Sequence, residues 1–134
     1  MEQTHLRPLL VLSGLFLIAL AVRVIYFVEL SQLPYFDVVL PVYDHFNFDQ
    51  GALNFAAGDG LARSPNNSYS PLYKYFLGSL YFIFGRNFYV VYGLQFVLGA
   101  LGAVLIFSIG KRLFDIRVGF LAFIGFAFYS TEII

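Results

Sequence analysis

The chain has 134 residues and no formal net charge; 60% of its residues are hydrophobic and 12% are charged, and its mean hydropathy is +0.78. A soluble domain of this size cannot hide so much apolar surface, so the composition predicts that a lipid bilayer is the solvent. The zero net charge predicts no nucleic-acid partner, and the absence of cysteine excludes disulfides, thiolate metal sites and cysteine nucleophiles.

Residues 9–30 form the first mainly apolar run, and at about 22 residues this run can cross a hydrocarbon core roughly 30 Å thick. A cleaved secretory signal is the competing interpretation, with Arg7 as its basic end and a cleavage site at residues 19–21. The apolar run continues beyond that site and further runs follow it. The sequence therefore favours an uncleaved span that passes from the cytoplasm to the outside.

Arg23 lies inside this predicted span, about two turns from its outer end. A cation at such a depth costs on the order of 3 kcal/mol on insertion scales. Its long side chain could snorkel to the outer interface, as cations near helix ends do. Alternatively, it faces a polar cavity and meets an anionic group there. The sequence leaves both interpretations open.

Residues 31–87 form the predicted outer loop, which contains half of the carboxylates of this apolar chain, among them Asp44, Asp49 and Asp59. We interpret the stretch at residues 41–60 as an active-site loop held at the membrane surface. Within the outer loop, Asp44 is a candidate N-cap for a short helix at about residues 45–57.

That first short helix carries Phe48, Ala52 and Phe55 on one side, so it can lie on the membrane or pack on neighbouring helices. A glycine-rich segment at residues 58–60 ends it. The pair Ser70-Pro71 then starts a second helix, at about residues 71–85. This helix is short for a membrane span, so we expect it to lie in the interface.

Two further apolar runs, at about residues 88–110 and 117–133, complete a prediction of about three transmembrane helices. Small residues at positions 99–103 suit close helix contact. The basic residues Lys111, Arg112 and Arg117 favour the cytoplasmic side. The predicted topology therefore has a cytoplasmic N-terminus and residues 31–87 outside. Because the last run ends without a polar tail, we expect the N-terminal part of a larger polytopic protein.

The acidic loop does not carry a recognisable metal or nucleophile motif. Asp44 and Asp49 are five residues apart, about 140° around a helix, so they cannot clamp one metal ion. His45 and Asp49 do share a helix face. They could ligate a metal, but a salt pair or plain solvation fits them better. No metal ligand is assigned, although a divalent cation stays open as a cofactor.

Several motifs follow one another in an order that resembles a known family. The first is Asp-x-x-x-aromatic-Asp-x-x-Ala, which begins at Asp44. The others lie at residues 56–59, 70–77, 81–85, 95–101 and 110–114. This order is similar to the N-terminal part of the polytopic C-type membrane glycosyltransferases. Within them it looks closest to the bacterial enzymes related to protein O-mannosyltransferases and to the lipid A aminoarabinose transferase.

The resemblance implies an all-α integral membrane fold with short juxtamembrane helices in the outer loop. It implies transfer of a sugar from a polyprenyl-phosphate donor to a protein, lipid or glycan acceptor, on the outer face of the inner (plasma) membrane. In enzymes of this family, an acidic residue after the first span serves as catalytic base or binds the acceptor. The resemblance places Asp44 at that position. Asp49 would support Asp44, Arg23 and Lys74 are candidates to bind the donor phosphate, and Glu132 would belong to a second acidic site.

The chain departs from the family pattern at three positions. Ser70 stands where some relatives have lysine before proline, Lys74 stands where relatives often have a second proline, and Phe48 lacks the hydroxyl of the usual tyrosine. Glu132 can equally be an acid solvated at the end of a span. A second hypothesis is a non-catalytic small membrane protein that assists the assembly or translocation of lipid-linked sugars.

Overall fold

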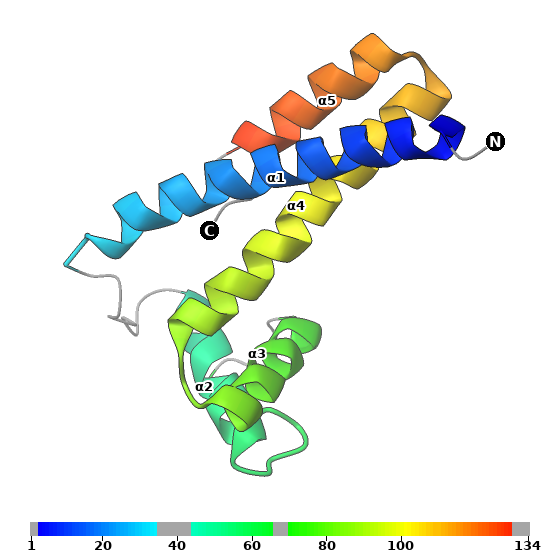
Figure 1. Cartoon of the computed structure of the whole chain (residues 1–134). Helices are drawn as coiled ribbons and strands as arrows, with labels where there is room; N and C mark the ends of the chain where they lie inside the picture. Colours follow the sequence, from blue (N-terminus) through cyan, green and yellow to red (C-terminus); the bar gives the residue numbers. More distant parts are fainter. Residues whose placement is uncertain (1–2, 35–43, 66–69, 130–134) are drawn as a thin grey trace. The chain divides into compact units, whose positions relative to one another are not determined.

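The computed structural model describes residues 3–34, 44–65 and 70–129, and of residues 3–8 it describes the backbone only. These parts of the chain form five α-helices and no strand, which confirms the predicted all-α class (Figure 1). The helices are α1 (Gln3–Ser31), α2 (Asp44–Ala56), α3 (Pro71–Phe84), α4 (Phe88–Leu113) and α5 (Ile116–Phe128).

Among the described residues, two helices are long and apolar enough to cross a membrane. They cover Leu9–Ser31 within α1, with 23 residues and a hydropathy of 2.4, and Phe88–Leu113, with 26 residues and a hydropathy of 2.2. By length and composition they confirm the runs predicted at residues 9–30 and 88–110. Helix α5 has 13 residues, and the predicted span at 117–133 ends outside the described residues.

The chain divides into two compact units. The first, which we call the three-helix unit, consists of Met1–Leu33 and Gly93–Ile134; the second, the hairpin unit, is Pro34–Tyr92. The first unit therefore contains α1, most of α4, and α5. The second contains α2, α3 and the first turn of α4.

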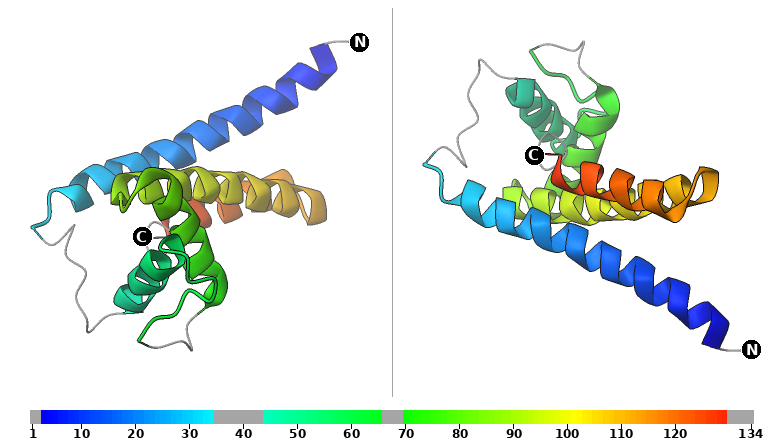
Figure 2. Two further views of the ribbon diagram at one scale, coloured as in Figure 1. Left: turned by 90° about the horizontal axis from the view of Figure 1, so that it is seen from below. Right: turned by 90° about the horizontal axis from the view of Figure 1, so that it is seen from above.

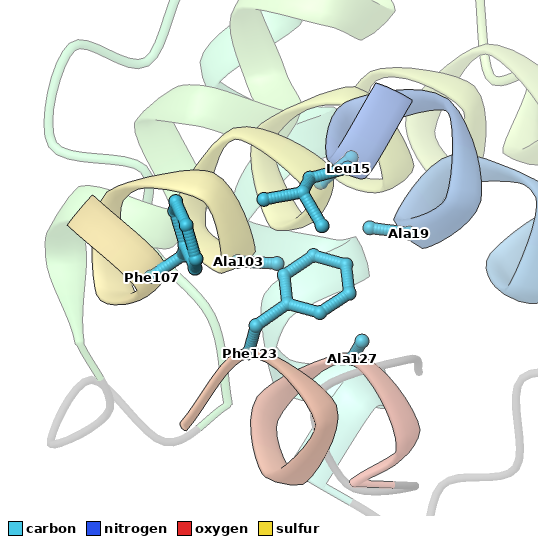
Figure 3. Packing of buried hydrophobic residues seen from close by; sticks show 7 residues of the cluster. Leu15, Ala19, Ala103, Phe107, Phe123 and Ala127 are labelled. Atoms are coloured by element: carbon cyan, nitrogen blue, oxygen red, sulfur yellow. The ribbon is translucent and has the colours of Figure 1, made fainter. Parts of the chain in front are cut away.

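Small and aromatic side chains form the core of the three-helix unit. Figure 3 shows Leu15 and Ala19 of α1 pointing towards side chains of α4 and α5. Ala100 and Ala103 of α4 are completely buried in this cluster. Alanine brings helix backbones close together, so the small segment at residues 99–103 acts as predicted.

A link of two residues, 114 and 115, joins α4 to α5. The side chain of Asp115 caps α5 by accepting a hydrogen bond of 2.9 Å from the backbone N–H of Val118. After this turn α5 folds back on α4 (Figure 2). A Cβ atom at Gly119 would lie 2.9 Å from the carbonyl oxygen of Phe107 and 3.0 Å from the backbone nitrogen of Lys111. Only glycine fits between the two helices at this point.

In the hairpin unit, α2 and α3 lie side by side (Figure 2). The face of α2 that carries Phe48 and Ala52 packs against Leu77, Leu80 and other residues of α3. The predicted apolar face thus contacts a neighbouring helix. Helix α3 begins at Pro71 and ends at the C-cap Gly85, whose φ of 72° is a conformation that favours glycine. Both ends agree with the predicted helix at residues 71–85.

Substitution of Gly119 by alanine should destabilise the contact between α4 and α5, because the added methyl group meets backbone atoms that cannot move away. We expect a loss of about 1–3 kcal/mol in unfolding free energy, measured by thermal unfolding of the purified protein in detergent. Gly125→Ala is the matched control in the same helix, since nothing lies within 4 Å of a Cβ atom there. Equal stabilities of the two variants would contradict the close contact.

Candidate functional site

A buried carboxylate holds the hairpin unit together. Asp49 of α2 is 4% exposed, and Arg86, just after α3, donates two hydrogen bonds to it. Nε lies 2.9 Å from Oδ1 and Nη2 lies 3.0 Å from Oδ2. Tyr81 of α3 also donates its hydroxyl proton to Oδ1, over 2.9 Å. Bidentate Arg–carboxylate pairs are among the strongest hydrogen-bonded contacts in proteins, so this cluster fixes α2 against the end of α3.

The surroundings of the cluster keep its donors protonated. Burial, together with the hydrogen bond to Asp49, raises the pKa of the Tyr81 phenol well above its ordinary value. The hydrogen bonds to Asp49 raise the pKa of the Arg86 guanidinium. The guanidinium also lies over the ring of Phe88, with Cζ 4.8 Å from the ring centroid. Asp49 is therefore a carboxylate whose hydrogen-bond donors keep their protons. It is better suited to holding α2 in position than to transferring a proton.

Asp44, the predicted catalytic residue, is exposed and is the first residue of α2. Asp49 on the same helix is buried. The two carboxylates thus lie in different environments, as expected for positions about 140° apart on a helix. An exposed carboxylate on a fixed helix is accessible to a substrate, whereas Asp49 is occupied by Arg86 and Tyr81. Asp49 is therefore suited to the supporting role that the resemblance implies.

Lys74 lies between the two helices of the hairpin. It is 3% exposed, and its ammonium donates a hydrogen bond of 2.7 Å to Oγ of Ser64. Its aliphatic part crosses α2 at Gly51, where an added Cβ atom would come within 2.6 Å of Cδ of Lys74. A phosphate at Lys74 would have to share the ammonium with Ser64. The structure thus places this candidate next to α2, with a partner that sequence reasoning did not identify.

The segment between α2 and α3 is ordered by its own polar contacts. The carboxylate of Asp59 accepts hydrogen bonds of 3.2 Å from the backbone N–H groups of Leu61 and Arg63, and these bonds lower the pKa of Asp59. Asn54 of α2 donates a hydrogen bond of 2.6 Å to the carbonyl oxygen of Arg63. These contacts hold the segment that carries Ser64 against α2.

Arg23 belongs to the three-helix unit and is completely buried. Its Nη1 donates to the carbonyl oxygen of Ala19, over 3.1 Å and four residues back along α1. Gly99 of α4 makes room for it, because a Cβ atom there would lie 2.6 Å from Nε. The ring centroid of Phe126 in α5 lies 5.9 Å from Cζ of Arg23. The side chain points back along α1 towards its N-terminal end and is enclosed, so it does not extend towards the C-terminal end of α1, as snorkelling to the predicted outer interface would require.

The remaining sequence candidates give no additional site. Glu132 lies outside the described residues. Within the described parts of the chain, no group of three or more histidine, aspartate and glutamate residues could hold a metal ion. The carboxylate of Asp49, which shares a helix face with His45, is bound by Arg86 and Tyr81. The sequence analysis considered an ion pair between His45 and Asp49. Asp49 does form an ion pair, but its partner is Arg86.

Sequence reasoning missed Arg86 and Tyr81 as the partners of Asp49. One signal was present: Asp49 lies three residues before Ala52, next to the apolar face of α2. A carboxylate at the edge of a buried face needs a cation or several hydrogen-bond donors. Arg86 is the cation that follows the predicted end of α3. The register between α2 and α3, which brings Arg86 and Tyr81 to Asp49, could not be predicted from the sequence.

Comparisons of the chain with protein-family models, with curated proteins and with solved structures found no match.

We expect Arg86→Gln to destabilise the hairpin unit more than Asp49→Asn. Loss of the guanidinium leaves a carboxylate that is 5% exposed, whereas the side chain of Arg86 is 39% exposed and can be solvated when Asp49 is neutral. Breaking a buried pair typically costs about 3–5 kcal/mol. Because Arg86 is partly exposed, we expect about 2–3 kcal/mol for Arg86→Gln and less for Asp49→Asn.

Thermal unfolding of the purified variants measures this order. Arg63→Gln is the matched control, because Arg63 pairs with Asp59 at 3.8 Å and its side chain is 66% exposed. Its loss should cost less than about 1 kcal/mol. If Arg86→Gln were no more destabilising than Arg63→Gln, Asp49 and Arg86 would not be a structural pair.

Proposed function

We propose that this chain forms the acceptor-activating part of a glycosyltransferase in the inner (plasma) membrane. It would transfer a sugar from a polyprenyl-phosphate donor to a protein, lipid or glycan acceptor on the outer face. The observation that carries the proposal is the pair of carboxylates on α2. Asp49 is buried and hydrogen-bonded to Arg86 and Tyr81, which holds α2 in place. Asp44 is the first residue of α2 and is exposed.

The chemistry that we propose needs a base next to the acceptor. Asp44 accepts the proton of the acceptor hydroxyl as its oxygen attacks the anomeric carbon of the donor sugar. The bond between that carbon and the phosphate oxygen breaks, and polyprenyl phosphate leaves with the electron pair. Lys74, in the same unit as Asp44, is the cation proposed to stabilise the leaving phosphate. For Lys74 this requires the ammonium to exchange its contact with Ser64 for one with the phosphate. Arg23, the other candidate from the sequence, is completely buried in the three-helix unit.

The exposed side of α3 supports a position at the membrane surface. Leu72 is 79% exposed, Phe82 76% and Ile83 66%, so large apolar side chains of this short helix project away from α2 and the hairpin core. Large exposed apolar groups typically mark a surface that contacts lipid or another protein. A short helix with such a surface can lie in the interface, close to a lipid-linked donor.

The topology can be tested with single cysteines, because the chain contains none. We expect a membrane-impermeant maleimide to label Ala57→Cys, in the segment after α2, in intact cells. Phe114→Cys, between α4 and α5, should be labelled only after the inner membrane is permeabilised, because Lys111, Arg112 and Arg117 favour the cytoplasm. Both positions are exposed. Labelling of Phe114→Cys in intact cells would overturn the proposed orientation.

Substitution of Asp44 by asparagine in the whole gene product should reduce sugar transfer by about 10²–10⁴-fold, the usual contribution of a general base. Mass spectrometry of membrane lipids should show the polyprenyl-phosphate sugar accumulating while the glycosylated acceptor disappears. Asp59→Asn is the control, since Asp59 is also a carboxylate of the hairpin unit but its bonds serve the local backbone. Both variants should insert normally.

Normal transfer by Asp44→Asn would reject its role as base. If deletion of the gene abolished glycosylation while Asp44→Asn preserved it, the result would favour the second hypothesis, a non-catalytic protein that assists assembly or translocation of lipid-linked sugars.

A further inference from the structure

A groove opens in the three-helix unit where α4 ends and α5 begins, beside the beginning of α1. Its volume is about 630 Å³, within the range of roughly 300–1,000 Å³ that is usual for small-molecule sites. Its walls are mostly apolar, and the charged side chains among its described lining residues are two cations. The apolar walls include Val11, Leu12, Phe107 and Ile116, and the cations are Lys111 and Arg112.

The two cations are available to a ligand. Both lie in the last turn of α4 and are exposed, and cations are favourable there because the terminal carbonyl groups are negative. Within the described residues, neither forms an ion pair. The carboxylate that follows them in sequence, Asp115, is bound to the backbone N–H of Val118 as the cap of α5. No ion pair joins either cation to this carboxylate.

This combination selects one kind of occupant. A free anion such as phosphate would gain from the cations but would leave the apolar walls uncovered. A neutral lipid would cover the walls but leave the cations without a counter-charge. An acidic phospholipid satisfies both, because its phosphate and its acyl chain meet the two parts of the groove together. Basic pockets between membrane helices on the cytoplasmic side are known to bind anionic headgroups.

We propose that this groove binds one acidic phospholipid, with its headgroup phosphate at Lys111 and Arg112 and an acyl chain along Val11, Leu12 and Phe107. All the lining residues belong to the three-helix unit, and the site does not depend on the proposed glycosyl transfer. It requires only that the three-helix unit lies in a bilayer. The lipid would join the beginning of α1 to the end of α4.

The test uses the whole chain, purified in neutral detergent and titrated with phosphatidylglycerol while bound lipid is counted by native mass spectrometry. We expect one tightly retained phosphatidylglycerol and weaker binding of phosphatidylcholine with the same acyl chains. Lys111→Gln and Arg112→Gln should each lower the apparent affinity about fivefold, given about 1 kcal/mol per basic residue. Arg117→Gln is the matched control, because Arg117 is an exposed cation nearby that does not line the groove.

A second pair of variants tests the apolar wall and leaves every charge in place. Val11→Trp fills the groove and should weaken phosphatidylglycerol binding, whereas Leu10→Trp, at a neighbouring exposed position outside the lining, should not. Circular dichroism checks that each variant is helical. If a glutamine variant does not fold, the comparison of Val11→Trp with Leu10→Trp decides whether the groove binds the lipid. Millimolar inorganic phosphate should not displace the lipid.

Three results would overturn the proposal. An equal loss of affinity in Arg117→Gln and Lys111→Gln would indicate a diffuse basic surface. Equal binding by Val11→Trp and Leu10→Trp would show that the groove is not used. Displacement by inorganic phosphate would indicate an anion site without a role for the acyl chain.

Discussion

Asp49 reaches from α2 to Arg86, the first residue after the C-cap of α3, and hydrogen bonds of 2.9 and 3.0 Å close that contact. The bonded residues are 37 positions apart in sequence, so the contact joins the two ends of the segment between them. A carboxylate that is 4% exposed is stable in its charged form only with such partners. The apolar contacts of Ala52 and Leu77 give the hairpin its core, and the polar cluster specifies which faces of α2 and α3 meet.

This constraint explains why two carboxylates on one short helix differ. Once Asp49 faces α3, the helical rotation of about 140° leaves Asp44 facing away from the buried contact. Gly51, two residues after Asp49, lies beneath Lys74, whose ammonium reaches Ser64. Asp44 is the first residue of α2 and is exposed there. The candidate base of the proposed reaction therefore depends on a cluster that takes no part in the chemistry.

The sequence predicted the elements better than the contacts between them. Ser70-Pro71 and Gly85 marked the two ends of α3 because proline and glycine act on the local backbone. The apolar runs predicted two helices of spanning length for a similar reason, since length and hydropathy are local properties. The partners of Asp49 and Lys74 could not be predicted, because they depend on the register of α2 against α3. The direction of Arg23 depended on Gly99, 76 positions further along the chain.

The two cations that are buried in the described parts of the chain are accommodated in the same way. Lys74 crosses Gly51 and Arg23 lies against Gly99, and in each case a Cβ atom on the glycine would come within 2.6 Å of the cationic side chain. Long cationic side chains have apolar stems that bury well, but they need space beside a neighbouring backbone. A glycine on the facing helix provides this space without interrupting the packing around it. The positions of these glycines therefore determine where each unit can hold an internal positive charge, and a methyl group at either one would force the cation to move.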